Sequence, residues 1–151
     1  MRAVVQRVAW ARVTVEAAVI SEIGPGLCVL AGAMQGDSPP DASFIAHKLA
    51  TLRIFPDAAG KMNLNVLDSG GGVLLISQFT LAADTTSGTR PSFSSALDPR
   101  EAELLLNQLA GELRAQGLTV ATGSFGAKME VELLNDGPVT IYVDSRDKQR
   151  K

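Results

Sequence analysis

Apolar residues recur with a period of two along the first part of the chain. The segment 2–8 is rich in valine, and in the segment 11–20 valine alternates with arginine, threonine and glutamate. Such alternation is typical of strands with one buried face. A turn signal, Ile-Gly-Pro-Gly at 23–26, precedes the apolar run 27–33, which is expected to be a fully buried strand.

A helical period follows these strands. Pro39 and Pro40 precede the predicted helix, and either Ser38 or Asp41 can cap its first turn. The stripe expected to face the core consists of Phe44, Ile45, Leu49 and Leu52.

The second predicted helix has clearer boundary signals. Asp98 is the expected N-cap, Pro99 takes the first helical position, and Glu101 is expected to complete a capping box. Gly117 is expected just past the C-terminal end, where helices favour glycine. The inward face is expected to consist of Ala102, Leu105, Leu106, Leu109 and Leu113.

The other apolar runs predict strands at 73–81, 118–122, 130–134 and 139–143. Between the last two, Asn-Asp-Gly-Pro at 135–138 predicts a hairpin turn, although a proline beside a strand removes a backbone donor. Because strands arrive in runs interrupted by two helices, the pattern predicts an α+β fold. We expect a mostly antiparallel or mixed sheet with a barrel-like core and two main helices.

Length and composition limit the number of domains, the possible partners and the location of the protein. The 151 residues, 46% of them hydrophobic, suffice for one compact domain, which we place at 1–145 with a basic, disordered tail at 146–151. A net charge of −2 disfavours broad binding to a phosphate backbone, so any nucleic-acid contact should be local. The single cysteine, Cys28, excludes an internal disulfide and is expected to be a buried small hydrophobe. No run reaches the roughly 18 apolar residues of a membrane span, and a reducing, cytoplasmic location is expected.

The usual catalytic side chains are scarce. The only histidine, His47, falls on the outward side of the first helix, which disfavours a His-based triad. One histidine and one cysteine cannot form a zinc site of the usual kind, and no phosphate-binding GxxxxGK[ST] loop is present. A carboxylate-only metal site stays open, although the acidic residues form no cluster. If the protein is an enzyme, it is therefore expected to work without the common side-chain catalysts, and no cofactor is expected.

Three motifs carry candidate chemistry. The polar groups of "SQFTL" at 77–81 end the most apolar strand, where they either satisfy neighbouring backbone or face a ligand. The loop "GTRPSF" at 88–93 joins Arg90, which can pair with phosphate, to Phe93, which can stack on a base; a solvated loop is the commoner explanation. "FGAKM" at 125–129 sets an aromatic residue and a methionine around a glycine, as core residues or as pocket walls.

Together with "NDGPVT" at 135–140, these motifs stand in an order and at a spacing that resemble the D-aminoacyl-tRNA deacylase family, first called D-tyrosyl-tRNA deacylase. The start "MRAVVQRV" and "LRIFPDAAGKMN" at 52–63 also match, so the resemblance covers residues 1 to about 145. It implies hydrolysis of the ester that joins a D-amino acid to the 3′ end of tRNA. It also implies action on glycine mischarged onto tRNA(Ala), a homodimer, and no metal.

The resemblance assigns roles to particular residues. Gly137 and Pro138, joined by a cis peptide bond in the family, would reach into the partner subunit's active site and exclude L side chains with their carbonyl oxygens. Arg7 matches an arginine that holds this Gly-Pro loop. The catalytic strand end that lines the pocket would be Ser77, Gln78, Phe79 and Thr80. The remaining substrate-binding residues would be Phe125, Met129 and Arg90.

The implied chemistry needs no histidine. Backbone N–H groups near Phe79 and Thr80 can stabilise the developing oxyanion, and the family view is that the terminal ribose 2′-OH of the tRNA assists. Thr80 as a covalent nucleophile would need a base, and the sequence offers none. A backbone wall rejects any L side chain and still admits glycine. Two other hypotheses remain: a nucleic-acid-binding module with a vestigial pocket, and a general acyl hydrolase that uses Thr80.

Three features depart from the family pattern. Ala82 stands where a bulky residue is frequent, Cys28 replaces the usual leucine, and the loop 85–90 lacks a basic residue often found before Arg90. We expect Cys28 to be neutral for packing and the grip on the tRNA acceptor end to differ.

Overall fold

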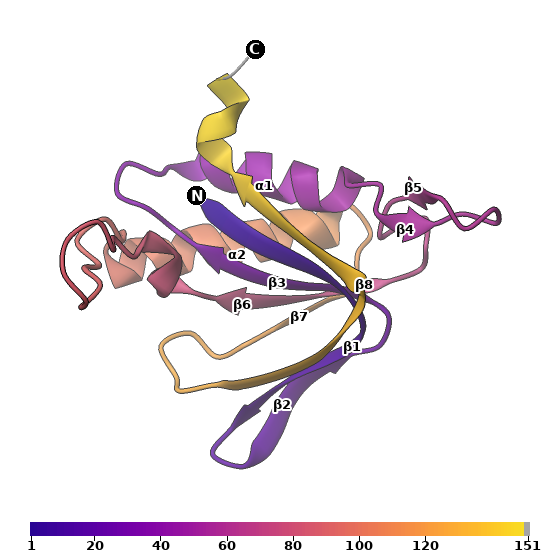
Figure 1. Cartoon of the computed structure of the whole chain (residues 1–151), viewed down its shortest axis with the longest axis horizontal. Helices are drawn as coiled ribbons and strands as arrows, with labels where there is room; N and C mark the ends of the chain where they lie inside the picture. The colour runs from indigo at the N-terminus through magenta and orange to yellow at the C-terminus, as the bar shows by residue number, and fades with distance from the viewer. Residues whose placement is uncertain (150–151) are drawn as a thin grey trace.

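Six strands form one curled, mixed sheet, and two α-helices cover one of its faces (Figure 1). The computed structural model describes residues 1–149, and the last two residues of the predicted tail lie outside this range. The elements are β1 (Arg2–Val15), β2 (Ala18–Ile23), β3 (Gly26–Gly32), α1 (Pro39–Thr51), β4 (Phe55–Pro56), β5 (Met62–Leu64), β6 (Gly72–Ser77), the 3₁₀ helix η1 (Phe79–Ala82), α2 (Pro99–Ala115), β7 (Val120–Thr122), β8 (Glu130–Asp144) and the 3₁₀ helix η2 (Ser145–Gln149). The predicted α+β class with a mixed sheet and two main helices is confirmed.

The strand order is β2-β1-β3-β6-β7, and β8 pairs along the other side of β1. Strands β3, β6 and β7 run parallel, whereas β1 is antiparallel to β2, β3 and β8. The parallel strands therefore end at the same edge of the sheet. Loops gather at that edge and, together with α2, form the walls of a mainly apolar cavity.

Two of the strands differ from their predicted extents. β1 is one long strand that turns into β2 at Glu16 and Ala17, both of which have positive φ (49° and 62°). Sequence patterns placed no turn there because neither residue is glycine or asparagine, the usual occupants of such positions. The predicted strand 73–81 is too long, since β6 ends at Ser77 and η1 follows after Gln78.

The predicted hairpin at 135–138 is wrong. β8 is one strand, and both of its halves pair with β1: Arg2 to Gln6 lie opposite Asp144 to Thr140, and Val8 to Thr14 lie opposite Asn135 to Glu130. Between these stretches β1 contributes one residue and β8 contributes four, 136–139. We call these four residues the Gly-Pro bulge. The turn formers were identified correctly, but they make the strand project outward instead of reversing it.

Alternate residues of the strands face two apolar clusters. Odd-numbered residues of β3, such as Leu27 and Val29, pack with both helices, whereas Cys28 packs with Leu74 and Ile76 on the other face. Cys28 is fully buried, as predicted, and burial raises its pKa to about 11. A buried protonated thiol of this kind is a packing group and not a nucleophile.

The helices follow the predicted pattern with corrections at their first turns. Pro39 and Pro40 are the first two helical residues of α1, not residues before it, and the Asp41 carboxylate accepts from both the N–H and the hydroxyl of Ser38. In α2 the Asp98 carboxylate accepts from the Arg100 N–H at 2.9 Å. The predicted inward residues of α2 are all buried.

Two sequence predictions concern the ends of α2. At its first turn, among the described residues, the capping box expected with Glu101 is not formed. Gly117, just past its C-terminal end, has the expected positive φ of 91°.

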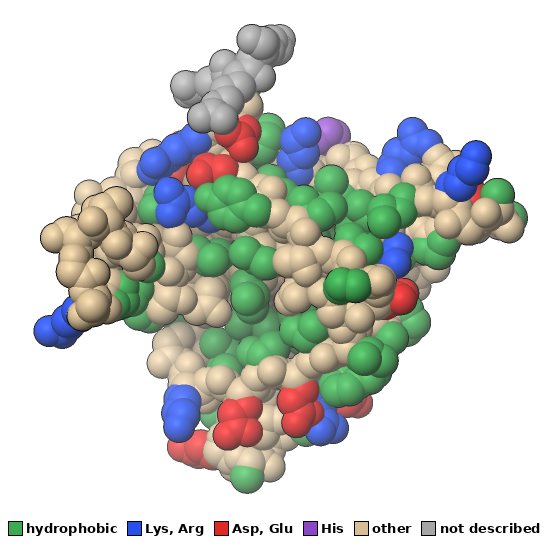
Figure 2. Space-filling model, viewed as in Figure 1, with side chains coloured by type: hydrophobic (Ala, Val, Ile, Leu, Met, Phe, Trp, Pro, Cys, Tyr) green, Lys and Arg blue, Asp and Glu red, His purple; other side chains and the backbone are tan. Residues whose placement is uncertain are grey.

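On the surface of the molecule, His47 is exposed on α1, as predicted. No helix among residues 1–149 is long and apolar enough to cross a membrane. Figure 2 shows apolar side chains gathered over the middle of one face, with charged side chains toward its borders.

Candidate active site

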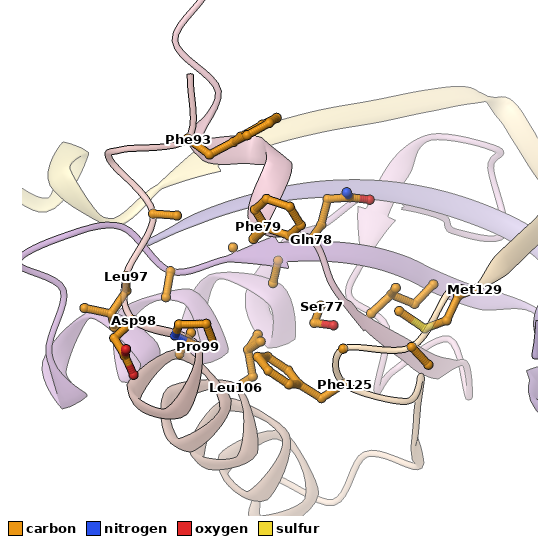
Figure 3. Close-up of a pocket in the computed structure, with 18 of the residues that line it drawn as sticks. Ser77, Gln78, Phe79, Phe93, Leu97, Asp98, Pro99, Leu106, Phe125 and Met129 are labelled. Atoms are coloured by element: carbon orange, nitrogen blue, oxygen red, sulfur yellow. The ribbon is translucent and has the colours of Figure 1, made fainter. Parts of the chain in front are cut away.

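A cavity of about 640 Å³ opens where the parallel strands β3 and β6 end (Figure 3). Its floor comes from these strand ends, and its walls come from η1, the loop before α2, the first turns of α2 and the loop after β7. The lining is mainly apolar. Polar side chains come from Ser77 and Gln78, and Asp98 is the one ionisable residue that lines it within the described chain.

The end of β6 shapes the cavity floor. The Gln78 N–H still donates to the Ala31 carbonyl at 2.8 Å, and the chain then turns into η1. Gly32 allows this turn, because a Cβ there would lie 2.5 Å from the Gln78 carbonyl oxygen. Glycine at this position is therefore required by close backbone approach rather than by an unusual φ.

The turn into η1 exposes backbone donors. Among the described residues, no acceptor is recorded for the N–H groups of Phe79 and Thr80. The Phe79 side chain is 60% exposed, contrary to its predicted place in a buried strand. Exposed N–H groups beside a largely apolar cavity are suited to binding an oxyanion.

Thr80 lies outside the cavity lining. Its hydroxyl accepts a hydrogen bond from the Gln78 side-chain amide, and both groups are solvent-exposed. Among the described residues, no histidine or lysine lines the cavity, and the side-chain partner of the Thr80 hydroxyl is an amide, which cannot act as a general base.

The loop between β7 and β8 closes the cavity on the side facing α2. Phe125 and Met129 both line it. A Cβ at Gly123 would lie 2.7 Å from the Met129 sulfur, so this glycine gives Met129 its place. Leu106 of α2 also lines the cavity (Figure 3).

A second notable region is the Gly-Pro bulge. The Gly137–Pro138 peptide bond is cis, and Gly137 has a φ of 137°. The Asn135 side chain spans the base of the bulge: it accepts from the Val139 N–H at 2.9 Å and donates to the Thr140 hydroxyl at 2.9 Å. These contacts fix the two ends of the bulge against each other.

Arg7 holds the bulge from β1. Its side chain is nearly buried, donating from Nε to the Asp136 carbonyl at 3.0 Å and from Nη1 to the Ile54 carbonyl at 2.6 Å. The guanidinium therefore ties the bulge to the segment between α1 and β4. A planar, charged fork of donors suits two carbonyl acceptors at fixed positions.

The bulge and the cavity lie at opposite ends of the strands. Arg7, beside the bulge, pairs with Leu27 at the start of β3, whereas Ser77 pairs with Ala31 near its end. Four strand residues separate the two levels, which corresponds to about 13 Å. Gly137, Pro138 and Arg7 are thus not part of the cavity of their own chain.

The predicted site residues therefore fall into three groups. Ser77, Gln78, Phe79, Phe125 and Met129 line the cavity; Gly137, Pro138 and Arg7 form the bulge; Thr80 and Arg90 lie outside both, on exposed backbone. Arg90 belongs to the polar loop that precedes Phe93.

Arg2 has a role that sequence patterns did not reveal. Its Nη1 donates to the Leu81 carbonyl at 2.8 Å, and its Nε lies 3.4 Å from the Asp144 carboxylate. Asp144 is fixed in turn by the Tyr142 hydroxyl at 3.2 Å. Arg2 thus anchors the end of η1 to β1 and β8. Only its charge, at the start of a strand rich in apolar residues, could have drawn attention to it.

Comparison with known proteins places these features in a family. A family model described as D-Tyr-tRNA(Tyr) deacylase matches residues 4–144. A D-aminoacyl-tRNA deacylase from Ruegeria pomeroyi is 59% identical, and the match covers 95% of this chain and 99% of that protein. One from Heliobacterium modesticaldum is 56% identical, with 97% of each chain covered.

Solved structures agree in fold. A structure titled c-Myc DNA Unwinding Element Binding Protein is 40% identical, with a TM-score of 0.90 over 95% of this chain and 98% of that one. A probable eukaryotic D-amino acid tRNA deacylase superposes with a TM-score of 0.78 over 95% of this chain and 98% of that one. Its identity is 15%, so the likeness concerns the fold alone.

Proposed function

This chain belongs to the D-Tyr-tRNA(Tyr) deacylase family and is a hydrolase of aminoacyl-tRNA, and we propose that it removes D-amino acids from the 3′ end of tRNA by means of the two regions described above. We assign the activity to residues 1–145. The observation that carries the proposal is the apolar cavity with exposed N–H groups, at the strand end that bears the predicted motif.

In the proposed reaction the terminal adenosine and its aminoacyl ester enter the cavity. The ester carbonyl oxygen points at the N–H groups of Phe79 and Thr80, which stabilise the negative charge that develops there. Water adds to the carbonyl carbon and the bond to the ribose 3′ oxygen breaks, with the neighbouring 2′-OH assisting proton transfer. Because an aminoacyl ester is already activated, backbone stabilisation and positioning suffice.

Selection against L-amino acids is assigned to the Gly-Pro bulge. Gly137 brings no side chain, and the contacts of Arg7 and Asn135 hold the bulge rigidly. A rigid backbone wall rejects an L side chain of any identity, because the clash arises at the α-carbon. Glycine has no side chain, so glycine carried by tRNA(Ala) should also be hydrolysed.

This assignment requires a second copy of the chain. A bulge about 13 Å along the strands from its own cavity can act only on a partner's substrate. The outer face of β1 and β8 next to the bulge carries the exposed side chains of Trp10, Leu134 and Tyr142, an apolar surface suited to a twofold interface. We propose a homodimer in which each bulge enters the partner's cavity.

The decisive assay compares D-tyrosyl-tRNA with L-tyrosyl-tRNA as substrates. We expect release of D-tyrosine and sparing of the L ester. Equal rates on both esters would contradict the selection mechanism. Binding of tRNA without any ester cleavage would instead favour a nucleic-acid-binding module, which is worth testing because one similar structure is named for binding DNA.

Hybrid dimers of two variants test the shared site. Gly32→Ala disturbs the cavity floor and should abolish hydrolysis, and Gly137→Ala disturbs the bulge and should abolish discrimination. In a purified hybrid dimer the one working cavity faces the intact bulge if sites are shared between subunits, so the hybrid should hydrolyse D-tyrosyl-tRNA and spare the L ester. A hybrid that hydrolysed both esters, like the Gly137→Ala dimer, would contradict the shared site.

A further inference from the structure

Two phenylalanines form an aromatic pair at the rim of the cavity. The rings of Phe79 and Phe93 meet edge to face, with centroids 5.1 Å apart and an interplanar angle of 68°. In Figure 3, Phe79 lies between Phe93 and Ser77, so the pair leads outward from the strand end. Phe79 is 60% exposed, and its contact with Phe93 makes an aromatic surface at the rim instead of one isolated apolar side chain.

Phe93 is held in place on both sides along the chain. Just before it, Asp84 and Ser92 exchange two backbone hydrogen bonds of 2.8 and 2.9 Å. Just after it, the Phe93 carbonyl accepts from Ala96 at 3.0 Å. The ring therefore projects from a fixed backbone position, although the intervening loop 85–91 is exposed.

The loop between Asp84 and Ser92 carries one cation and no additional acid. Arg90 is its only charged residue, and the Asp84 carboxylate at its base is engaged by the N–H and hydroxyl of Thr86. These hydrogen bonds hold the pKa of Asp84 below its usual range. The rim thus combines the exposed Phe79 and the half-buried Phe93 with an exposed arginine that forms no ion pair within the described chain.

We propose that the Phe79–Phe93 pair is a stacking site for the penultimate, unpaired nucleotide of the RNA substrate, with Arg90 directed at the adjoining phosphate. The inference rests on the proposed function, in which the terminal adenosine fills the cavity. The preceding nucleotide is covalently attached to that adenosine and must leave by the rim. Exposed aromatic side chains bind single-stranded bases by stacking and tolerate any base, since every base has a π face.

This site explains how a chain with a net charge of −2 can hold an RNA end. Stacking contributes affinity without a broad basic surface, and one arginine adds a local charge contact. The site should therefore distinguish substrates by the presence of a penultimate nucleotide and not by its base.

The test compares two substrates, D-tyrosyl-adenosine and the D-tyrosyl ester of the trinucleotide CCA. In the wild type, kcat/KM should be higher for the trinucleotide. Phe93→Ala should lower the ratio of the two kcat/KM values by about tenfold, in the range measured for loss of one base–aromatic stack. Phe93→Trp should restore it. Leu104→Ala, which truncates an exposed residue of α2 away from the rim, should leave the ratio unchanged.

An equal fall on both substrates would overturn the stacking site, because it would mean that Phe93 only supports the cavity wall. An unchanged ratio would overturn it as well. Replacing Arg90 with glutamine should reduce the slope of log kcat/KM against log salt for the trinucleotide by about 0.7, as expected for one contact to single-stranded phosphate. An unchanged slope would overturn the phosphate contact.

A binding measurement separates this inference from the proposed function. A trinucleotide with 2-aminopurine at the penultimate position and a non-hydrolysable 3′-amide should lose fluorescence when wild-type protein is added, since stacking quenches this base. The Phe93→Ala variant should not quench it at saturating protein. Quenching by the wild type without any ester hydrolysis would refute the deacylase mechanism and leave the stacking site standing. Binding without quenching would refute the stacking site alone.

Discussion

The two ends of strands β3 and β6 are built in opposite ways. At the cavity end, backbone donors stay free and the walls are apolar side chains from separate loops. At the bulge end, a nearly buried arginine and an asparagine bind the backbone from both sides. The contrast fits the proposed division of roles, in which the cavity accepts and activates the substrate and the bulge must keep its position to discriminate.

The largest expected effect comes from adding one methyl group to the bulge. In Gly137→Ala, the new Cβ would lie 2.8 Å from a Val139 methyl carbon and 3.1 Å from Arg7 Nη2, at a φ of 137° that L residues rarely adopt. A shift of the bulge by about 1 Å should cost roughly a hundredfold in discrimination between D- and L-tyrosyl-tRNA.

Gly36→Ala is the matched control. Gly36 also has positive φ, but a Cβ there would meet no atom within 4 Å. Backbone strain alone should lower stability and leave discrimination intact. If both variants lost discrimination equally, the geometry of the bulge would not be its source.

A smaller effect is expected from Arg7→Ala. The variant removes two donors, so the carbonyls of Asp136 and Ile54 lose their partner and the free energy of unfolding should fall by about 2 kcal/mol. We expect discrimination to fall about tenfold, by the loss of pre-organisation. Urea denaturation and the two kinetic assays measure these changes. Arg7→Lys should recover stability only in part, since an ammonium cannot reproduce the planar fork.

At the cavity end, Arg2→Ala should affect rate and not selection. It removes the hydrogen bond to the Leu81 carbonyl, which anchors η1 to β1. The Phe79 and Thr80 N–H groups belong to η1, so their positions should become less fixed. We expect kcat for D-tyrosyl-tRNA to fall about fivefold and the free energy of unfolding to fall by about 1 kcal/mol. The ratio of D to L rates should stay constant. A changed ratio would show that the two ends are not independent.

Thr80→Ala should have the smallest effect. The Thr80 hydroxyl is exposed and outside the cavity, so activity should stay within about threefold of the wild type if no covalent threonine takes part. Single-turnover hydrolysis of D-tyrosyl-tRNA measures it. A loss of several orders of magnitude would instead support the general acyl hydrolase that uses this threonine.

Local signals in the sequence predicted the elements that local physics determines. The N-cap at Asp98, the left-handed Gly117 and the apolar face of α2 depend on neighbouring residues only, and all three are present. The burial of Cys28 and the exposure of His47 follow from the same periodicities.

Features that depend on distant partners were harder to predict. The residues 135–138 have turn chemistry, but pairing of both flanks with β1 makes them a bulge, and this pairing is not visible locally. Ser77 ends its strand because Gly32 admits the Gln78 carbonyl from the neighbouring strand. The family resemblance supplied the motifs at both ends, and the loop 88–93 already offered Phe93 as a residue that can stack on a base. The pairing of Phe93 with Phe79 and the contacts of Arg2 depend on distant partners and emerged only from the structure.

The bulge in β8 also determines which changes in chain length this fold can absorb. Its two flanks keep their own register with β1, so adding or removing a residue within 136–139 alters the reach of the projection and leaves both flanks paired. A single insertion at 130–134 would instead move every following side chain of that flank to the opposite face of the sheet. The register therefore lets the depth of the projection change one residue at a time, while the flanks accept substitutions but not insertions.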